Sequence, residues 1–188
     1  NWNLQGVLEA AEEAVKWGGP ESEPALSASY IANVAKVALT GANVDMPVMP
    51  GESKVLAQRR HMVVGWVKLA NDDPVSARQE LQQLPREEGA TRIDLWQIAW
   101  LARAEFLLGE WDDALATVEK GLFQSDHFGI DLLDPLLLWT GAIISQLRGD
   151  YSIAADYRNR LIISNDAFVI QKVPAAITRV VTGLRENQ

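Results

Sequence analysis

The sequence predicts an all-α fold, built as an array of antiparallel helical hairpins with about nine helices in a single domain over residues 1–188. Three observations carry this prediction. Segments of about 11 to 18 residues with helical periodicity alternate with breakers rich in Gly, Pro, Asn and Asp. A short turn pattern recurs along the chain, and no segment shows a convincing strand alternation.

The breakers divide the chain into the expected helices. Clear examples are Gly18-Gly19-Pro20 and the stretch 71–74, which combine turn residues with a proline that favours a helix start. The expected helices span 3–17, 24–40, 53–70, 74–84, 94–108, 111–124, 132–148, 151–164 and 167–184. A weak strand alternative remains open at 168–170, where Phe, Val and Ile precede Pro174.

One turn pattern occurs three times. A glycine is followed two positions later by an aromatic residue and five positions later by an alanine. The corresponding residues are Gly109, Trp111 and Ala114, then Gly149, Tyr151 and Ala154 after a spacing of 40, and a weaker copy 37 residues before the first, Asp72, Pro74 and Ala77. Seven residues before each turn position stands a small residue: Gly65, Ala102 or Ala142.

The spacing has a physical reason in a helical hairpin. The turn needs a residue that tolerates positive φ and ends the first helix, which glycine does at little cost. Acidic residues that follow it, such as Asp112 and Asp113, lie at the start of the second helix, where the helix dipole favours negative charge. Small residues let the two backbones approach closely. Clear units are therefore expected at about 54–84, 94–124 and 132–164, with the helices within 3–40 and 167–184 as partial or capping units.

This pattern resembles the tetratricopeptide (TPR) helical repeat, and the resemblance implies a right-handed TPR-like α-solenoid. Three departures are visible. The unit spacings of 37 and 40 exceed the family's roughly 34 residues, and the family's aromatic residue in the first helix is replaced by Lys68, Glu105 and Ser145. The family's closing proline is absent from the two best copies.

Three further stretches resemble the repeat region of LuxR-type ATPase transcriptional regulators of the maltose-regulon-activator kind. They read ARAEFLLGEWDDALATVEKGL, GIDLLDPLLLWTGAIISQLRGDYSIAADY and VPAAITRV. This resemblance implies a sensor or oligomerisation segment between a nucleotide-binding domain and a helix-turn-helix. The chain is then expected to be a piece of a longer regulator, although a processed mature chain stays open. A free-standing TPR-type adaptor is the alternative.

Composition argues against several functions. The chain has 17 Lys and Arg residues and 25 Asp and Glu residues, and the net charge of −8 disfavours direct nucleic-acid binding by this domain. The chain has no cysteine, and its apolar runs are too short for a membrane span. We expect a cytoplasmic location, which fits the lack of cysteine.

No catalytic motif is present, and the sequence predicts no enzyme activity, no cofactor and no metal site. Of the two histidines, His61 is expected within a helix and His127 in the loop 125–129. His61 is predicted to be a solvated or groove-edge residue and His127 a capping or surface residue, and the acidic pairs are predicted to cap helices or to be solvated.

Aromatic and arginine residues occupy corresponding positions on the first helix of each unit. On a TPR-like array this stripe faces the concave groove, where it is expected to bind a protein or peptide, or a small-molecule effector, with homo-oligomer formation also open. The alternative is that the large aromatics are core material between repeats. The predicted groove residues are Arg59, Met62, Trp66, Trp96, Arg103, Phe106, Trp139 and Ile143.

Overall fold

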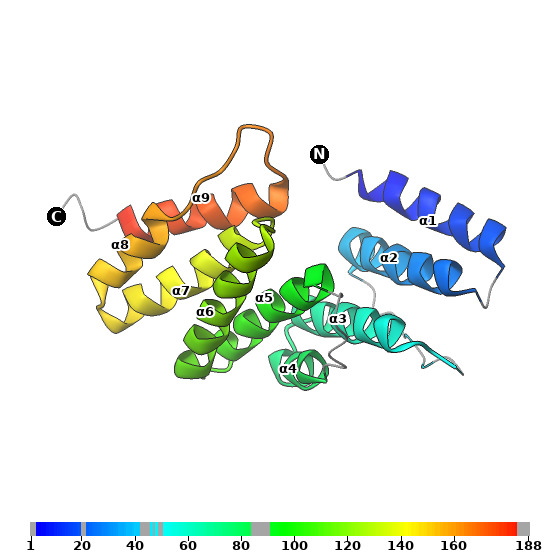
Figure 1. The fold of residues 1–188 in the computed structure, drawn as a ribbon, viewed down its shortest axis with the longest axis horizontal. Helices are drawn as coiled ribbons and strands as arrows, with labels where there is room; N and C mark the ends of the chain where they lie inside the picture. The colour runs from blue at the N-terminus through cyan, green and yellow to red at the C-terminus, as the bar shows by residue number, and fades with distance from the viewer. Residues whose placement is uncertain are drawn as a thin grey trace. The chain divides into compact units, whose positions relative to one another are not determined.

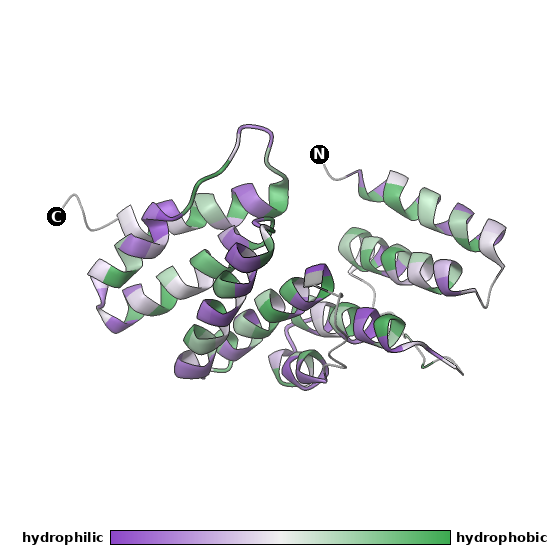
Figure 2. Cartoon of the chain, viewed as in Figure 1, coloured by the Kyte–Doolittle hydropathy of each residue, from purple (hydrophilic) through white to green (hydrophobic). Residues whose placement is uncertain are grey.

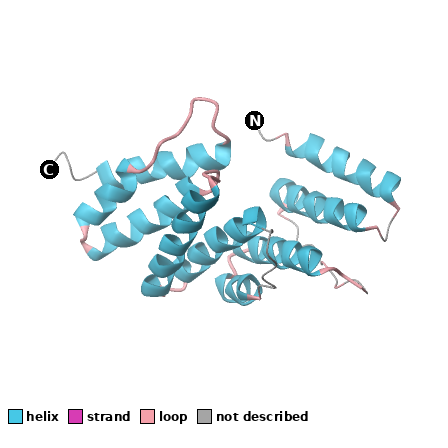
Figure 3. Ribbon diagram, viewed as in Figure 1, coloured by secondary structure: helices cyan, strands magenta, loops and turns pink. Residues whose placement is uncertain are grey.

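The computed structural model describes residues 3–19, 22–41, 46, 48, 51–83 and 91–183, with only the backbone of Thr91. Within these ranges the chain forms nine α-helices and no strand, so the all-α prediction is confirmed (Figure 1 and Figure 3). The helices are α1 Leu4–Gly18, α2 Glu23–Thr40, α3 Lys54–Ala70, α4 Pro74–Gln82, α5 Thr91–Leu107, α6 Trp111–Phe128, α7 Asp134–Arg148, α8 Tyr151–Asn159 and α9 Val169–Gly183.

The helices fall into two compact units, one over Trp2–Ile93 and one over Asp94–Gln188. In the first unit, α1 packs on α2, α2 on α3, and α3 on α4. In the second unit, α7 contacts α6, α8 and α9, and α8 also contacts α9. The expected single domain over 1–188 stays a prediction.

Two expected helix ends were wrong. Helix α8 ends at Asn159 rather than at 164, because the side chain of Leu161 is buried in the core. The next residues, Ile162 and Ile163, have β-branched side chains that disfavour a helix. Helix α6 continues to Phe128 and ends at Gly129 in the left-handed conformation, with φ 64°. His127 therefore lies in the last turn of a helix, not in a loop.

The weak strand alternative at 168–170 was also wrong. Val169 and Ile170 form the first turn of α9, and Pro174 is accommodated inside this helix as a buried residue. A short hydrophobic stretch fits either a strand or the start of a helix. The length of the periodic segment that follows it is needed to tell the two apart. The ribbon of α9 alternates between hydrophobic and hydrophilic stretches, as an amphipathic helix should (Figure 2).

The three turn copies share one backbone geometry. Their turn residues Asp72, Gly109 and Gly149 all have positive φ, at 59°, 78° and 87°. The residue after each turn position donates its N–H to the carbonyl five positions earlier, the long hydrogen bond of a Schellman C-cap. These bonds are Asp73 to Lys68 at 2.9 Å, Glu110 to Glu105 at 3.0 Å and Asp150 to Ser145 at 2.9 Å. The alanine of each copy, Ala77, Ala114 or Ala154, is fully buried.

The small residues permit close helix contact. A Cβ atom on Gly65 would lie 2.4 Å from Cγ of Leu81, and Ala102 and Ala142 are fully buried at the corresponding positions. In the third copy the neighbouring Gly141 has the same role, since a Cβ there would lie 2.7 Å from Cζ of Tyr157. Side chains of α4 and α8 thus fill the space directly above glycines of α3 and α7.

Each unit has its own core. The first unit buries Tyr30, Val37, Met46, Leu56, Val63 and Val67 together. The second buries a larger cluster drawn from α5 to α9 and the segments between them, whose members are Leu95, Ile98, Ala99, Ala102, Val118, Leu122, Leu133, Leu136, Leu137, Leu138, Ala142, Tyr157, Leu161 and Ala175. Helix α7 supplies four of these residues, because nearly every side chain from Pro135 to Ala142 is buried.

Candidate functional site

Helices α5 and α7 bring an arginine against two aromatic rings. Cζ of Arg103 lies 4.1 Å from the ring centroid of Trp139 and 4.8 Å from that of Phe106. Phe106 follows Arg103 by three positions on α5, so both occupy the same helix face, whereas Trp139 comes from α7. We call these three residues the arginine cluster.

The arginine cluster contains two buried donors without acceptors. Nη1 of Arg103 and Nε1 of Trp139 are both shielded from solvent, and neither has a hydrogen-bond partner in the described part of the chain. Desolvation lowers the pKa of Arg103, although the group remains charged at neutral pH. The Arg103 side chain as a whole is only half-buried, so a solute can reach it.

A second arginine in the same unit shows the usual arrangement. Cζ of Arg148 lies 5.8 Å from the ring centroid of Trp111, and its Nη2 is 2.8 Å from a carboxylate oxygen of Asp112. Here the ring contact is accompanied by an opposite charge. The arginine cluster has the ring contacts, but no acid from the described part of the chain pairs with it.

Trp96 lies on α5 two turns before Arg103 and pairs with Trp100, their ring centroids 6.3 Å apart at an interplanar angle of 32°. Both rings are half-buried and pack against the core cluster of this unit. Trp100 was not among the predicted groove residues, although its spacing of four from Trp96 and three from Arg103 is typical of one helix face. Ile143 is half-buried on α7, one turn after Trp139.

The other three predicted groove residues belong to the unit Trp2–Ile93. Met62 and Trp66 are partly buried against its core. Arg59 donates from Nη1 to Oγ of Ser27 at 2.7 Å. The structure thus joins Arg103, Phe106 and Trp139 in direct contact, and it places Arg59 in a separate setting between α2 and α3.

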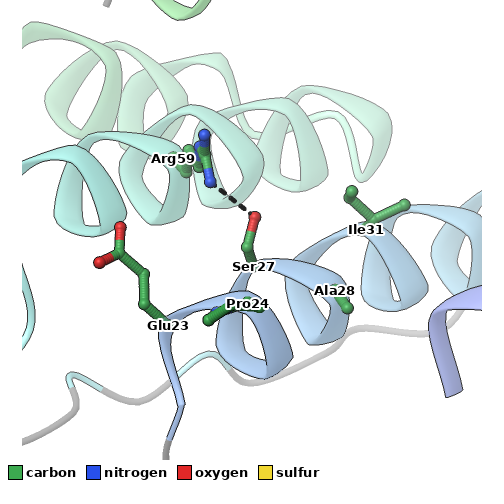
Figure 4. Close-up of a pocket in the computed structure, with 6 residues that line it drawn as sticks. All are labelled: Glu23, Pro24, Ser27, Ala28, Ile31 and Arg59. Atoms are coloured by element: carbon green, nitrogen blue, oxygen red, sulfur yellow. Dashed lines mark hydrogen bonds between the residues drawn. The ribbon is translucent and has the colours of Figure 1, made fainter. Parts of the chain in front are cut away.

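Arg59 lines an open hollow of about 390 Å³ on the surface of α2 and α3. Figure 4 shows Arg59 reaching from α3 toward Ser27, with the other lining residues along α2. The lining residues are Glu23, Pro24, Ser27, Ala28, Ile31 and Arg59. The hollow is shallow, and its arginine already has a hydroxyl acceptor.

A buried polar network connects α2, α3 and α4. Nε of Arg60 donates to both carboxylate oxygens of Glu52 at 3.1 and 3.2 Å, and the hydroxyl of Tyr30 donates to Glu52 at 2.8 Å. Nδ1 of His61 lies 2.8 Å from a carboxylate oxygen of Glu80. Sequence analysis did not find this network, because Glu52 precedes α3 and meets Tyr30 only after α2 and α3 pack. His61 thus contacts Glu80 of α4 with a side chain only 14% exposed, rather than lying in solvent as the sequence predicted.

The buried tyrosine of this network predicts alkaline destabilisation. Burial and the hydrogen bond to Glu52 raise the pKa of Tyr30 to about 12. A raised folded-state pKa contributes stability that is full below the unfolded-state value of about 10 and is lost as pH rises through the folded value. We expect the urea midpoint to fall between about pH 10 and 12, and Tyr30→Phe to reduce this decrease. Tyr151→Phe, at an exposed ring, serves as the control; an unchanged decrease in Tyr30→Phe would contradict the assignment.

Among the described residues no group of three or more histidine or acidic side chains lies close enough to hold a metal ion. Within the same ranges none of the helices combines the length and the apolar character that a bilayer crossing requires. Comparison of the chain with protein-family models, curated proteins and solved structures gave no match.

Proposed function

We propose that this chain is a non-catalytic interaction and sensor domain, a TPR-like array of antiparallel helical hairpins that binds a peptide, a protein or a small effector in a concave groove. The observation that supports it most is the turn that occurs three times with the same positive φ and the same long C-cap hydrogen bond. Repeat arrays of helix pairs commonly serve as binding scaffolds, because each helix pair contributes one helix to a continuous surface.

The groove in this proposal includes the stripe predicted from the sequence. Its strongest part is the arginine cluster with Trp96, since partly buried aromatic and arginine side chains supply both large contact area and a polar group. The resemblance to LuxR-type regulators adds a context: the domain would sense its ligand and control the self-association of a transcription factor in the cytoplasm. A free-standing adaptor would use the same groove and would come from a gene without nucleotide-binding and helix-turn-helix segments.

The test combines tryptophan fluorescence with thermal unfolding across a panel of short peptides and metabolites. We expect one panel member to shift the wild-type melting temperature, and Trp96→Ala or Trp139→Ala to abolish the shift. Trp17→Ala is the matched control, because that ring is 78% exposed on α1 and should leave the shift intact. The groove would be refuted if no panel member registers and both substitutions cost about 3–5 kcal/mol, the cost typical of core aromatics.

A further inference from the structure

We propose that Arg103 anchors the carboxylate of a ligand whose remaining body is apolar. This inference rests on the proposed function and names the chemistry of its groove. Three observations carry it: a guanidinium with a buried and unpartnered nitrogen, a second unpartnered donor on the ring that it contacts, and aromatic side chains along the same helix face.

Among the described residues, no acidic side chain pairs with Arg103, in contrast to Arg60 and Arg148. Arg60 forms a two-oxygen ion pair with Glu52, and Arg148 pairs with Asp112. Taking a charge out of water is costly unless an opposite charge and hydrogen bonds replace the lost hydration. The rings of Phe106 and Trp139 attract the guanidinium, but they offer no acceptor for its N–H groups. An anionic acceptor from outside the chain would supply both.

The geometry favours a carboxylate. The guanidinium is a planar fork whose N–H groups match two carboxylate oxygens, and Nε1 of Trp139 adds a single donor nearby. Because the Arg103 side chain is only partly buried, an incoming group can approach its accessible part, whereas the shielded Nη1 and the indole N–H of Trp139 become accessible only when these side chains move.

The surroundings favour an apolar body on that carboxylate. Trp96 and Trp100 lie seven and three positions before Arg103, on the same face of α5, and both rings are only partly buried. A ligand held at Arg103 can therefore cover aromatic surface while its carboxylate replaces water at the guanidinium. Sodium benzoate has both parts and is the simplest probe.

The experiment is a fluorescence titration of the full chain with sodium benzoate, with inorganic phosphate and sodium chloride as parallel arms at equal ionic strength. Thermal unfolding is followed in the same samples. Variants are Arg103→Met, which keeps the length and apolar stem of the side chain, and Arg148→Met, which removes an arginine that also contacts a tryptophan but already has an acid. Trp139→Phe removes the second donor and keeps a smaller aromatic ring, and it gives an independent measurement if Arg103→Met does not fold.

We expect saturable quenching by benzoate in the wild type and in Arg148→Met, at least a tenfold loss of affinity in Arg103→Met, and a smaller loss in Trp139→Phe. Saturation by phosphate but not by benzoate would overturn the carboxylate assignment. An equal response to all three salts, or no response in the wild type, would overturn the anchor itself. The peptide and metabolite panel tests the proposed function independently, so a ligand that needs Trp96 but not Arg103 would leave that function standing.

Discussion

Replacing Glu52 with alanine is expected to lower the free energy of unfolding of its unit by about 3–5 kcal/mol. Glu52 and Arg60 are nearly inaccessible, with side chains 5% and 10% exposed, and Glu52 accepts from Arg60 and from Tyr30. The substitution leaves the guanidinium of Arg60 buried with no carboxylate and leaves the Tyr30 hydroxyl without its acceptor. An unpaired buried charge is among the most costly defects that a single substitution can introduce.

Urea denaturation followed by circular dichroism measures this effect. Asp112→Ala is the matched control, because it also removes the acid of an arginine pair, but the Asp112 side chain is 91% exposed and the loss should stay below about 1 kcal/mol. Replacing both members, as Glu52→Leu with Arg60→Met, should cost less than Glu52→Ala alone, because no uncompensated charge remains. Equal losses for Glu52→Ala and Asp112→Ala would show that the network is not a buried one.

Leu137→Ala is expected to destabilise the unit Asp94–Gln188 by about 2–5 kcal/mol. Leu137 is fully buried on α7, the helix that contacts α6, α8 and α9. Its side chain occupies the space above Gly121, where an added Cβ would lie 2.8 Å from Cδ1 of Leu137. Truncation leaves a cavity bordered by two helices, and a glycine on α6 cannot fill it.

Leu147→Ala on the same helix is the control. That side chain is 59% exposed, so the change in unfolding free energy should lie within about 0.5 kcal/mol. Thermal or urea unfolding of both variants gives the comparison. If the two leucines cost the same, the assignment of α7 as the central helix of its unit is wrong.

The turns could be predicted from the sequence because their interactions are local. The long C-cap hydrogen bond joins residues five positions apart, and positive φ at Gly109 and Gly149 depends on the absence of a Cβ. The weaker copy at Asp72 takes the same conformation at φ 59°, which asparagine and aspartate tolerate better than other side chains. The buried small residues of each copy follow from the same spacing.

The helix ends were less predictable where packing competes with periodicity. The sequence past Asn159 has apolar residues that a helix could carry, but burial of Leu161 in the core favours an end to α8. At α6 the opposite occurs, since the left-handed Gly129 terminates the helix four residues beyond the expected end. Periodicity detects a helix, whereas its end depends on which side chain the core accepts.

For the candidate site, too, the local features could be predicted from the sequence, whereas the contacts between helices could not. The sequence by itself determined the helical fold, the turns and the stripe of aromatic and arginine residues, because these follow from backbone preference and spacing within one helix. Only the tertiary structure decided that Arg103 contacts Trp139, while Arg59 contacts Ser27 and Arg60 pairs with Glu52. The partners of these side chains lie on other helices or, for Arg60, in the segment before α3, so their identity depends on how the helices pack.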